Sequence, residues 1–123
     1  MTNDSGAAGA SDPDDGFTTA VLVERLDGDE EIAREVAVAF VESSRELLEQ
    51  LDAAVSAGAQ DQVRLHAHSI KGAAANIGAS ALAATASVVE DAGRDGDLDT
   101  ARQALPETRR RCERVLAVLE AWS

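Results

Sequence analysis

Residues 67–78 carry the most informative pattern in the chain: Ala67-His68-Ser69-Ile70-Lys71-Gly72-Ala73-Ala74-Ala75-Asn76-Ile77-Gly78. His68 is one of two histidines, Lys71 is the only lysine among 123 residues, and Gly72 interrupts a run that otherwise favours a helix. A helix turns by about 100° per residue, so Lys71 and Gly72 lie one turn beyond His68 on the same side. A nucleophile, a cation and a bare segment of backbone are therefore predicted to share one helical face.

The helix that carries this pattern is predicted to run from about Gln60 to Asn76. Apolar residues recur at intervals of four, three, four and three, which is the spacing of a buried helical stripe: Val63, Ala67, Ile70, Ala74 and Ile77. His68 lies just outside this stripe and is expected to face outward. His66 is about 200° away from it, so the two histidines cannot chelate one metal from a single face. We interpret His66 as a structural residue.

The sequence before this helix predicts one short helix and one long helix. Thr18 can cap the short helix, with Phe17 packing onto Leu22, and residues 27–29 end it and begin the next. The long helix is predicted from about Asp29 to Ala57. Its expected core stripe consists of Ile32, Val36, Ala39, Phe40, Ser43, Leu47, Leu51, Ala54 and Val55.

After residue 78, two more helices are predicted. The first runs from Ala79 or Ser80 to about Arg94, with a stripe formed by Leu82, Ala86, Val89 and Ala92 or Gly93. The second runs from about Leu98 to Ala121, and its inward-facing residues are Ala101, Leu105, Thr108, Cys112, Val115, Leu119 and Trp122. Pro106 has no N–H to donate, so a kink or a restart of this helix is expected there. The fold class is therefore all-α, an antiparallel up-down four-helix bundle with a short additional N-terminal helix.

Composition sets the domain organisation. Residues 1–16 are rich in Gly, Ala, Ser and Asp and have no periodicity, so a disordered acidic tail is expected there. Residues 17–123 suffice for one helical domain and are too few for two. Apolar residues make up 45% of the chain but aromatic residues only 2%, so the core must consist mainly of Ala, Val, Leu and Ile.

Charge and cysteine content exclude several classes of function. The net charge of −12 opposes binding to nucleic acid or to an anionic membrane, because phosphates would be repelled. The sequence contains no run of about 18 apolar residues, so no membrane span is predicted. The N-terminus lacks the features of a signal peptide. The single Cys112 excludes an internal disulfide and fits the cytoplasm. Cys and His are too few for a metal cluster, and a monomer is expected.

The chemistry expected at His68 is phosphoryl transfer. An exposed neutral imidazole can attack phosphorus and hold a phosphoryl group. Lys71 can stabilise the negative charge on that group, and Gly72 leaves room for a partner's active site to approach. Each element alone has a plain alternative, since a lone histidine is usually a solvated surface residue and a helical glycine can serve close packing.

The run from His68 to Gly78 resembles the signature of histidine-containing phosphotransfer (HPt) domains of bacterial phosphorelays. The similarity extends to residues 21–31, which resemble the family's first helix and turn, to residues 57–59, and to residues 92–97 at the end of the fourth helix. It covers about Phe17 to Trp122, which is nearly all of the expected ordered chain.

This resemblance implies a four-helix bundle whose exposed histidine carries phosphate between aspartates of receiver domains. It implies that His68 is the phosphorylated residue, that Lys71 stabilises charge and that Gly72 provides clearance. Two fourth-helix positions that border the histidine in the family correspond to Glu90 and Arg94. With three residues on the His68 face, they form the expected partner-binding set: Arg64, Leu65, Ala75, Glu90 and Arg94. No cofactor is expected in this chain, and Mg²⁺ belongs to the receiver.

Two other functions compete with the phosphocarrier. The phosphoacceptor region of a sensor histidine kinase needs an acidic residue after the histidine and a proline soon after it. Here Ser69 follows, and the next proline is Pro106. An ATP-binding domain would also need more chain and a Gly-rich phosphate loop. A structural adaptor bundle is not excluded by periodicity.

Expected partners are receiver domains of response regulators or a hybrid histidine kinase. Met1 fits a free-standing protein, although a part of a hybrid kinase could begin the same way.

Overall fold

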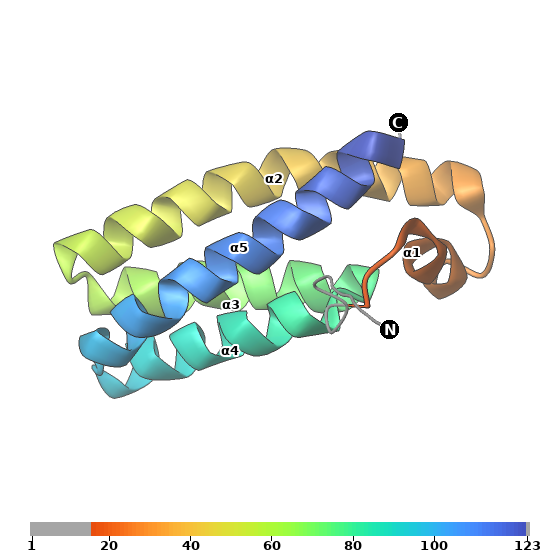
Figure 1. The fold of residues 1–123 in the computed structure, drawn as a ribbon. Coiled ribbons are helices and arrows are strands. Elements are labelled where there is room, and N and C mark those ends of the chain that lie inside the picture. Colours follow the sequence, from red (N-terminus) through yellow and green to blue (C-terminus); the bar gives the residue numbers. More distant parts are fainter. Residues whose placement is uncertain (1–15, 123) are drawn as a thin grey trace, which may run out of the picture.

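The computed structural model describes residues 16–122, and this part of the chain consists of five α-helices (Figure 1). They are α1 (Thr19–Arg25), α2 (Glu30–Ala57), α3 (Gln60–Ile77), α4 (Ser80–Asp95) and α5 (Leu98–Trp122). The tail expected at residues 1–16 lies outside the described residues except for Gly16. Within residues 16–122, none of the helices combines the length and the apolar character that crossing a membrane requires.

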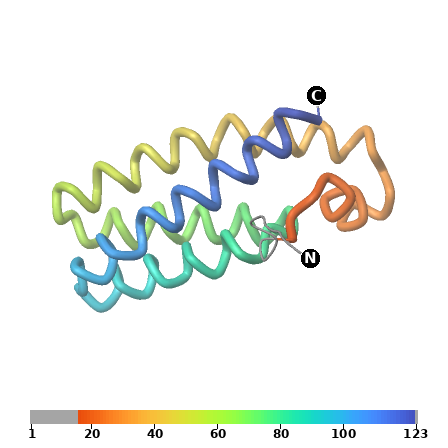
Figure 2. The backbone as a smooth tube through the Cα atoms, viewed as in Figure 1, coloured from red at the N-terminus to blue at the C-terminus, as the bar shows by residue number. Residues whose placement is uncertain are grey.

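The four long helices form an antiparallel up-down bundle. α3 packs between α2 and α4, and α5 closes the bundle between α4 and α2, so α3 and α5 lie diagonally opposite each other. The tube in Figure 2 shows α1 at the end of the bundle where α2 begins and α3 ends. There it contacts α2, α3 and α5. The predicted all-α four-helix architecture with a short leading helix is thus confirmed.

Local signals in the sequence set the helix ends. The Thr18 hydroxyl accepts a hydrogen bond from Val21 N at the start of α1, as expected. The Asp29 carboxylate does the same for Ile32 N at the start of α2, at 3.1 Å. Gly78 ends α3 in the left-handed conformation with φ 84°, and a Cβ there would lie 2.7 Å from Val21 Cγ1 of α1. Both the backbone angle and the contact with α1 therefore require glycine.

The stripes predicted for the last three helices form the core. Those of α3 and α4 are fully buried, and in α4 both Ala92 and Gly93 face inward. In α5 all the expected residues are buried except Trp122, which is half-buried with the Arg34 guanidinium 4.3 Å from its ring centre. α5 continues unbroken through Pro106, so the restart considered there does not occur. Pro106 has no N–H to donate, so the Arg102 carbonyl, four residues earlier, lacks its usual hydrogen-bond donor. Both residues are exposed, and water can donate to this carbonyl instead.

The stripe predicted for the first part of α2 is wrong by one residue. The buried row there is Ala33, Ala37, Phe40, Ser44 and Leu48, whereas Ile32 is 47% exposed. The expected row and the observed row both have spacings of three and four, and they differ by about 100° around the helix. Because both rows fit a helical period, the packing of the whole bundle decides which of them is buried.

Candidate functional site

His68 lies in the middle of α3 with its side chain 61% exposed. The buried stripe of α3 holds the opposite side of the helix against the core. The imidazole is therefore carried on a rigid helix yet is open to an approaching molecule. The expected outward position of His68 is confirmed.

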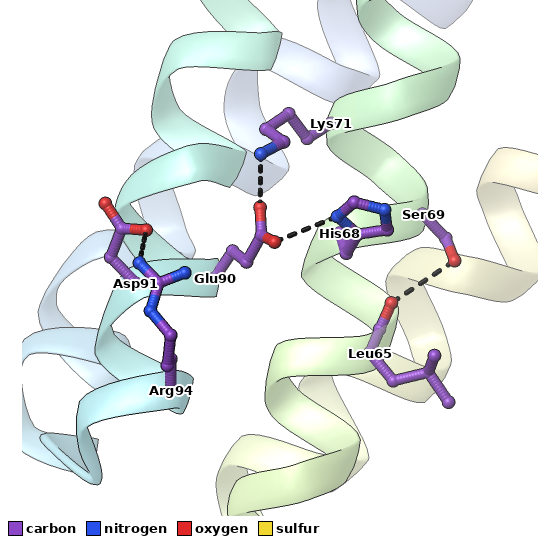
Figure 3. Close-up of polar contacts among 7 residues, drawn as sticks. All are labelled: Leu65, His68, Ser69, Lys71, Glu90, Asp91 and Arg94. Atoms are coloured by element: carbon purple, nitrogen blue, oxygen red, sulfur yellow. Dashed lines mark hydrogen bonds and ion pairs between the residues drawn. The ribbon is translucent and has the colours of Figure 1, made fainter.

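A carboxylate from α4 contacts both His68 and Lys71 of α3 (Figure 3). Glu90 Oε2 lies 2.9 Å from His68 Nδ1, and Glu90 Oε1 lies 2.6 Å from Lys71 Nζ. Glu90 is only 7% exposed. Lys71 and Glu90 therefore form a short ion pair. The Lys71 side chain is 35% exposed and retains access to solvent.

These contacts keep Glu90 ionised at neutral pH. The Lys71 ammonium is the largest influence and lowers the pKa of Glu90 below its usual value of 4.5. Desolvation of the carboxylate opposes this change, and the contact with His68 lowers the pKa further. The site therefore contains a shielded negative charge directly beside the imidazole.

The ionised carboxylate also fixes the tautomer of the histidine. A carboxylate can only accept a hydrogen bond, so His68 Nδ1 is the donor at 2.9 Å. When the ring is neutral, its lone pair is then on Nε2. Figure 3 shows that the second ring nitrogen points away from Glu90. The ring nitrogen with the lone pair thus points away from the carboxylate, and the nitrogen that carries the proton contacts it.

Two helical glycines flank this arrangement. A Cβ added at Gly72 would meet nothing within 4 Å, so the space beside His68 is open. A Cβ at Gly93 would lie 2.8 Å from Arg64 N and 3.0 Å from Arg64 Cα. α4 therefore lies against the α3 backbone one turn from Glu90, which brings its carboxylate within reach of His68. The predicted stripe contained Ala92 or Gly93, and its spacing gave no sign of this close approach.

The other residues expected around His68 lie on α3 and α4. Arg64, Leu65 and Ala75 are exposed on the same helix as His68, with Leu65 49% exposed. Arg94 is exposed and pairs with Asp91 of its own helix. Glu90 borders His68 as expected and is 7% exposed, so a partner-binding role for it stays a prediction.

Comparison with known proteins agrees with this geometry. Residues 35–121 match the model of the Hpt domain family. Among solved structures, histidine-containing phosphotransfer protein B from Pseudomonas aeruginosa PAO1 is similar, with 30% sequence identity and a TM-score of 0.76. That match covers 83% of this chain and 89% of the other. No match was found among curated proteins. The chain belongs to the Hpt domain family, whose members are phosphotransfer proteins of phosphorelays.

Proposed function

We propose that His68 accepts a phosphoryl group from an aspartyl phosphate of a receiver domain, or from a kinase, and passes it to an aspartate of a response regulator. The observation that carries this proposal is the anchored imidazole. His68 Nδ1 donates to the buried Glu90 carboxylate, while the side chain is 61% exposed. This arrangement leaves Nε2 as the atom that a phosphorylated partner meets.

The transfer step follows from that geometry. The Nε2 lone pair attacks phosphorus, and the P–O bond to the partner's carboxylate breaks, with the bonding electrons leaving on the carboxylate. The imidazole ring becomes positively charged, and the Nδ1–H bond to Glu90 stabilises that charge. Transfer to the next aspartate is the reverse of this step. Glu90 is a positioning residue in both directions.

Lys71 is proposed to stabilise the phosphoryl group. Its ammonium lies at Glu90 in the unphosphorylated protein, one helical turn from His68. The long flexible side chain can turn toward a phosphoryl group on Nε2, where a positive charge offsets the negative charge spread over the three oxygens. It acts by charge and not as a proton donor.

The surface around His68 is proposed to bind receivers. Gly72 leaves clearance for the partner's active site, since a Cβ there would meet nothing within 4 Å. Leu65 and Ala75 supply exposed apolar surface on either side of the histidine, and Arg64 and Arg94 supply charge near one end. Mg²⁺, where the reaction needs it, is held by the receiver. We further propose that the protein is a cytoplasmic monomer with no autokinase activity.

The test is phosphate acceptance by two matched variants, His68→Gln and His66→Gln. The purified proteins are incubated with a phosphorylated receiver domain, and acid-labile phosphate on this chain is measured. We expect His68→Gln to lose labelling completely and keep its fold, because the side chain is exposed. His66→Gln should still be labelled. Labelling of the His68 variant, or labelling of the unchanged chain by ATP and Mg²⁺ alone, would contradict the proposal.

A further inference from the structure

Both oxygens of the Glu90 carboxylate already have partners in the unphosphorylated protein. Oε2 lies 2.9 Å from His68 Nδ1, and Oε1 lies 2.6 Å from Lys71 Nζ (Figure 3). The Oε1 atom is buried, so water has little access to the position beside it that the ammonium occupies. An ionised carboxylate shielded in this way is destabilised when its counterion leaves.

Lys71 is also the cation that a phosphoryl group on His68 would attract. It is the only lysine of the chain, it lies three residues after His68, and its side chain is 35% exposed. A phosphoryl group carries roughly 1.5 to 2 negative charges. On α4, Arg94 is already paired with Asp91. The Lys71 ammonium therefore has two possible anionic partners, the buried carboxylate and the phosphoryl group.

We infer that Glu90 competes with the phosphoryl group for Lys71, and that this competition limits how much phosphorylated chain is present at equilibrium. This inference rests on the proposed function. When the bond from phosphorus to Nε2 forms and the P–O bond to the receiver's carboxylate breaks, Lys71 gains a contact with the phosphoryl oxygens and loses its contact with Glu90 Oε1. The loss offsets part of the gain, so the phosphoryl group is held less tightly and is passed on more readily.

The equilibrium constant of transfer separates this effect from docking. It depends on the free phosphorylated and unphosphorylated forms of each protein, so contacts made only in the complex with the receiver cancel. The constant is measured as the ratio of the second-order rates of forward and reverse transfer with one receiver domain. Four chains are compared: the unchanged chain, Lys71→Gln, Glu90→Gln and the variant with both substitutions. Urea denaturation of each chain checks that the bundle remains folded.

We expect Lys71→Gln to lower the equilibrium constant by about three- to tenfold more in the Glu90→Gln background than in the unchanged chain. Without the carboxylate, Lys71 contacts the phosphoryl group and no ion pair is lost. Glu90→Gln also changes the surroundings of the positively charged imidazole, but this contribution is present with and without Lys71 and cancels in the comparison. Glu49→Gln on α2 is the control, and it should leave the effect of Lys71→Gln unchanged.

A second measurement follows Lys71 directly and needs no receiver. Because the chain has one lysine, ¹⁵N labelling of lysine gives a single side-chain Nζ signal in NMR spectra. The His66→Gln variant, in which His68 is the one remaining histidine, is phosphorylated with phosphoramidate, a small phosphoryl donor. We expect the Nζ signal to move on phosphorylation. It should also move when Glu90→Gln removes the ion pair from the unphosphorylated chain.

Other outcomes overturn the inference in distinguishable ways. Equal effects of Lys71→Gln in the two backgrounds would show that there is no competition. A larger effect in the presence of Glu90 would show that the carboxylate holds Lys71 in place for the phosphoryl group. An Nζ signal unchanged by phosphorylation would show that Lys71 stays at Glu90, even if receivers label the chain. If no receiver labels the chain, the proposed function and the effect on equilibrium both fail, and the Nζ signal alone decides whether Glu90 and the phosphoryl group compete for Lys71.

Discussion

Gly72 of α3 and Gly93 of α4 both interrupt helices, but their surroundings are opposite. A Cβ at Gly72 would meet nothing within 4 Å, whereas a Cβ at Gly93 would come within 2.8 Å of the Arg64 backbone. Each glycine lowers helix stability by about 1 kcal/mol relative to alanine. The same unfavourable residue therefore lies beside open space at one position and permits close packing at the other.

The two glycines affect opposite sides of the His68 side chain. Gly93 follows Glu90 by three residues and lets α4 lie against α3, so the Glu90 carboxylate reaches His68 Nδ1 at 2.9 Å. Gly72 follows His68 by four residues and leaves its outer side open. Glu90 thus holds one side of the imidazole, and the space on the Gly72 side is open.

The largest expected effect on stability is the loss in Gly93→Gln. The new Cβ would overlap the Arg64 backbone, which cannot rotate away as a flexible side chain can, so α3 and α4 must separate. Overpacking of this kind costs about 3 kcal/mol, more than the ~1 kcal/mol gained in helix propensity. Urea denaturation should therefore show a lower free energy of unfolding. An unchanged value would mean that the contact between α3 and α4 is looser than its geometry indicates.

Gly72→Gln is the matched control, with the same substitution in open space. Its free energy of unfolding should stay the same or rise by up to about 1 kcal/mol, because glutamine favours a helix. Phosphate transfer should nevertheless fail, since the side chain would stand one turn from His68 where a receiver approaches. If this variant unfolds, Gly72 serves packing and the clearance argument is wrong.

How much the sequence predicts depends on the helix. In α3 the apolar residues form one narrow row, so the buried residues and the outward position of His68 were predicted correctly. In α2 two neighbouring rows fit a helical period, and the expected row through Ile32 was wrong because the observed row runs through Ala33 and Ala37. Periodicity does not show which of two adjacent rows faces the core when both contain small residues.

The contacts within the candidate site were not predictable from spacing. His68 and Glu90 lie 22 residues apart on different helices, and their 2.9 Å contact depends on how closely α3 and α4 pack. The family resemblance placed Glu90 near the histidine, but it did not show a buried carboxylate bound to both His68 and Lys71. A glycine at position 93 in an alanine-rich segment was the available signal, since a missing Cβ permits helices to approach.

The effect of Lys71 on the rate of phosphate transfer is expected to be smaller than that of Gly72. Lys71 lies one helical turn beyond His68 and contacts Glu90. Lys71→Gln should slow phosphate transfer by about ten- to a hundredfold, because one charge-assisted contact to the phosphoryl group contributes roughly 1–3 kcal/mol at the transition state. Single-turnover transfer from a phosphorylated receiver measures this rate. Binding of the unphosphorylated protein to the receiver should change little. Lys71→Arg keeps the charge and should retain more activity, whereas equal losses in both variants would argue against a role for charge.

The smallest expected effect is the pH-dependent stability supplied by Glu90. Its pKa lies below 4.5, chiefly because of the Lys71 ammonium, so the ionised carboxylate favours the folded state. That contribution is fully present above pH 4.5 and is lost as the pH falls through the lowered pKa. Glu90→Gln should therefore be about 1 kcal/mol less stable than the unchanged protein at pH 7, and the difference should shrink at about pH 3. Urea denaturation at both pH values measures it.

Glutamine matches glutamate in shape, which is why this substitution isolates charge from packing. Glu90→Gln can still accept a hydrogen bond from His68 Nδ1 through its amide oxygen, but it cannot form the ion pair with Lys71. Glu49→Gln on the exposed face of α2 is the control, and its stability should change by less than about 0.5 kcal/mol at either pH. If Glu90→Gln is equally destabilised at both pH values, the loss comes from hydrogen-bond geometry. The position of Glu90 beside His68 would then depend on packing and hydrogen-bond geometry, as at Gly93, and not on the ion pair with Lys71.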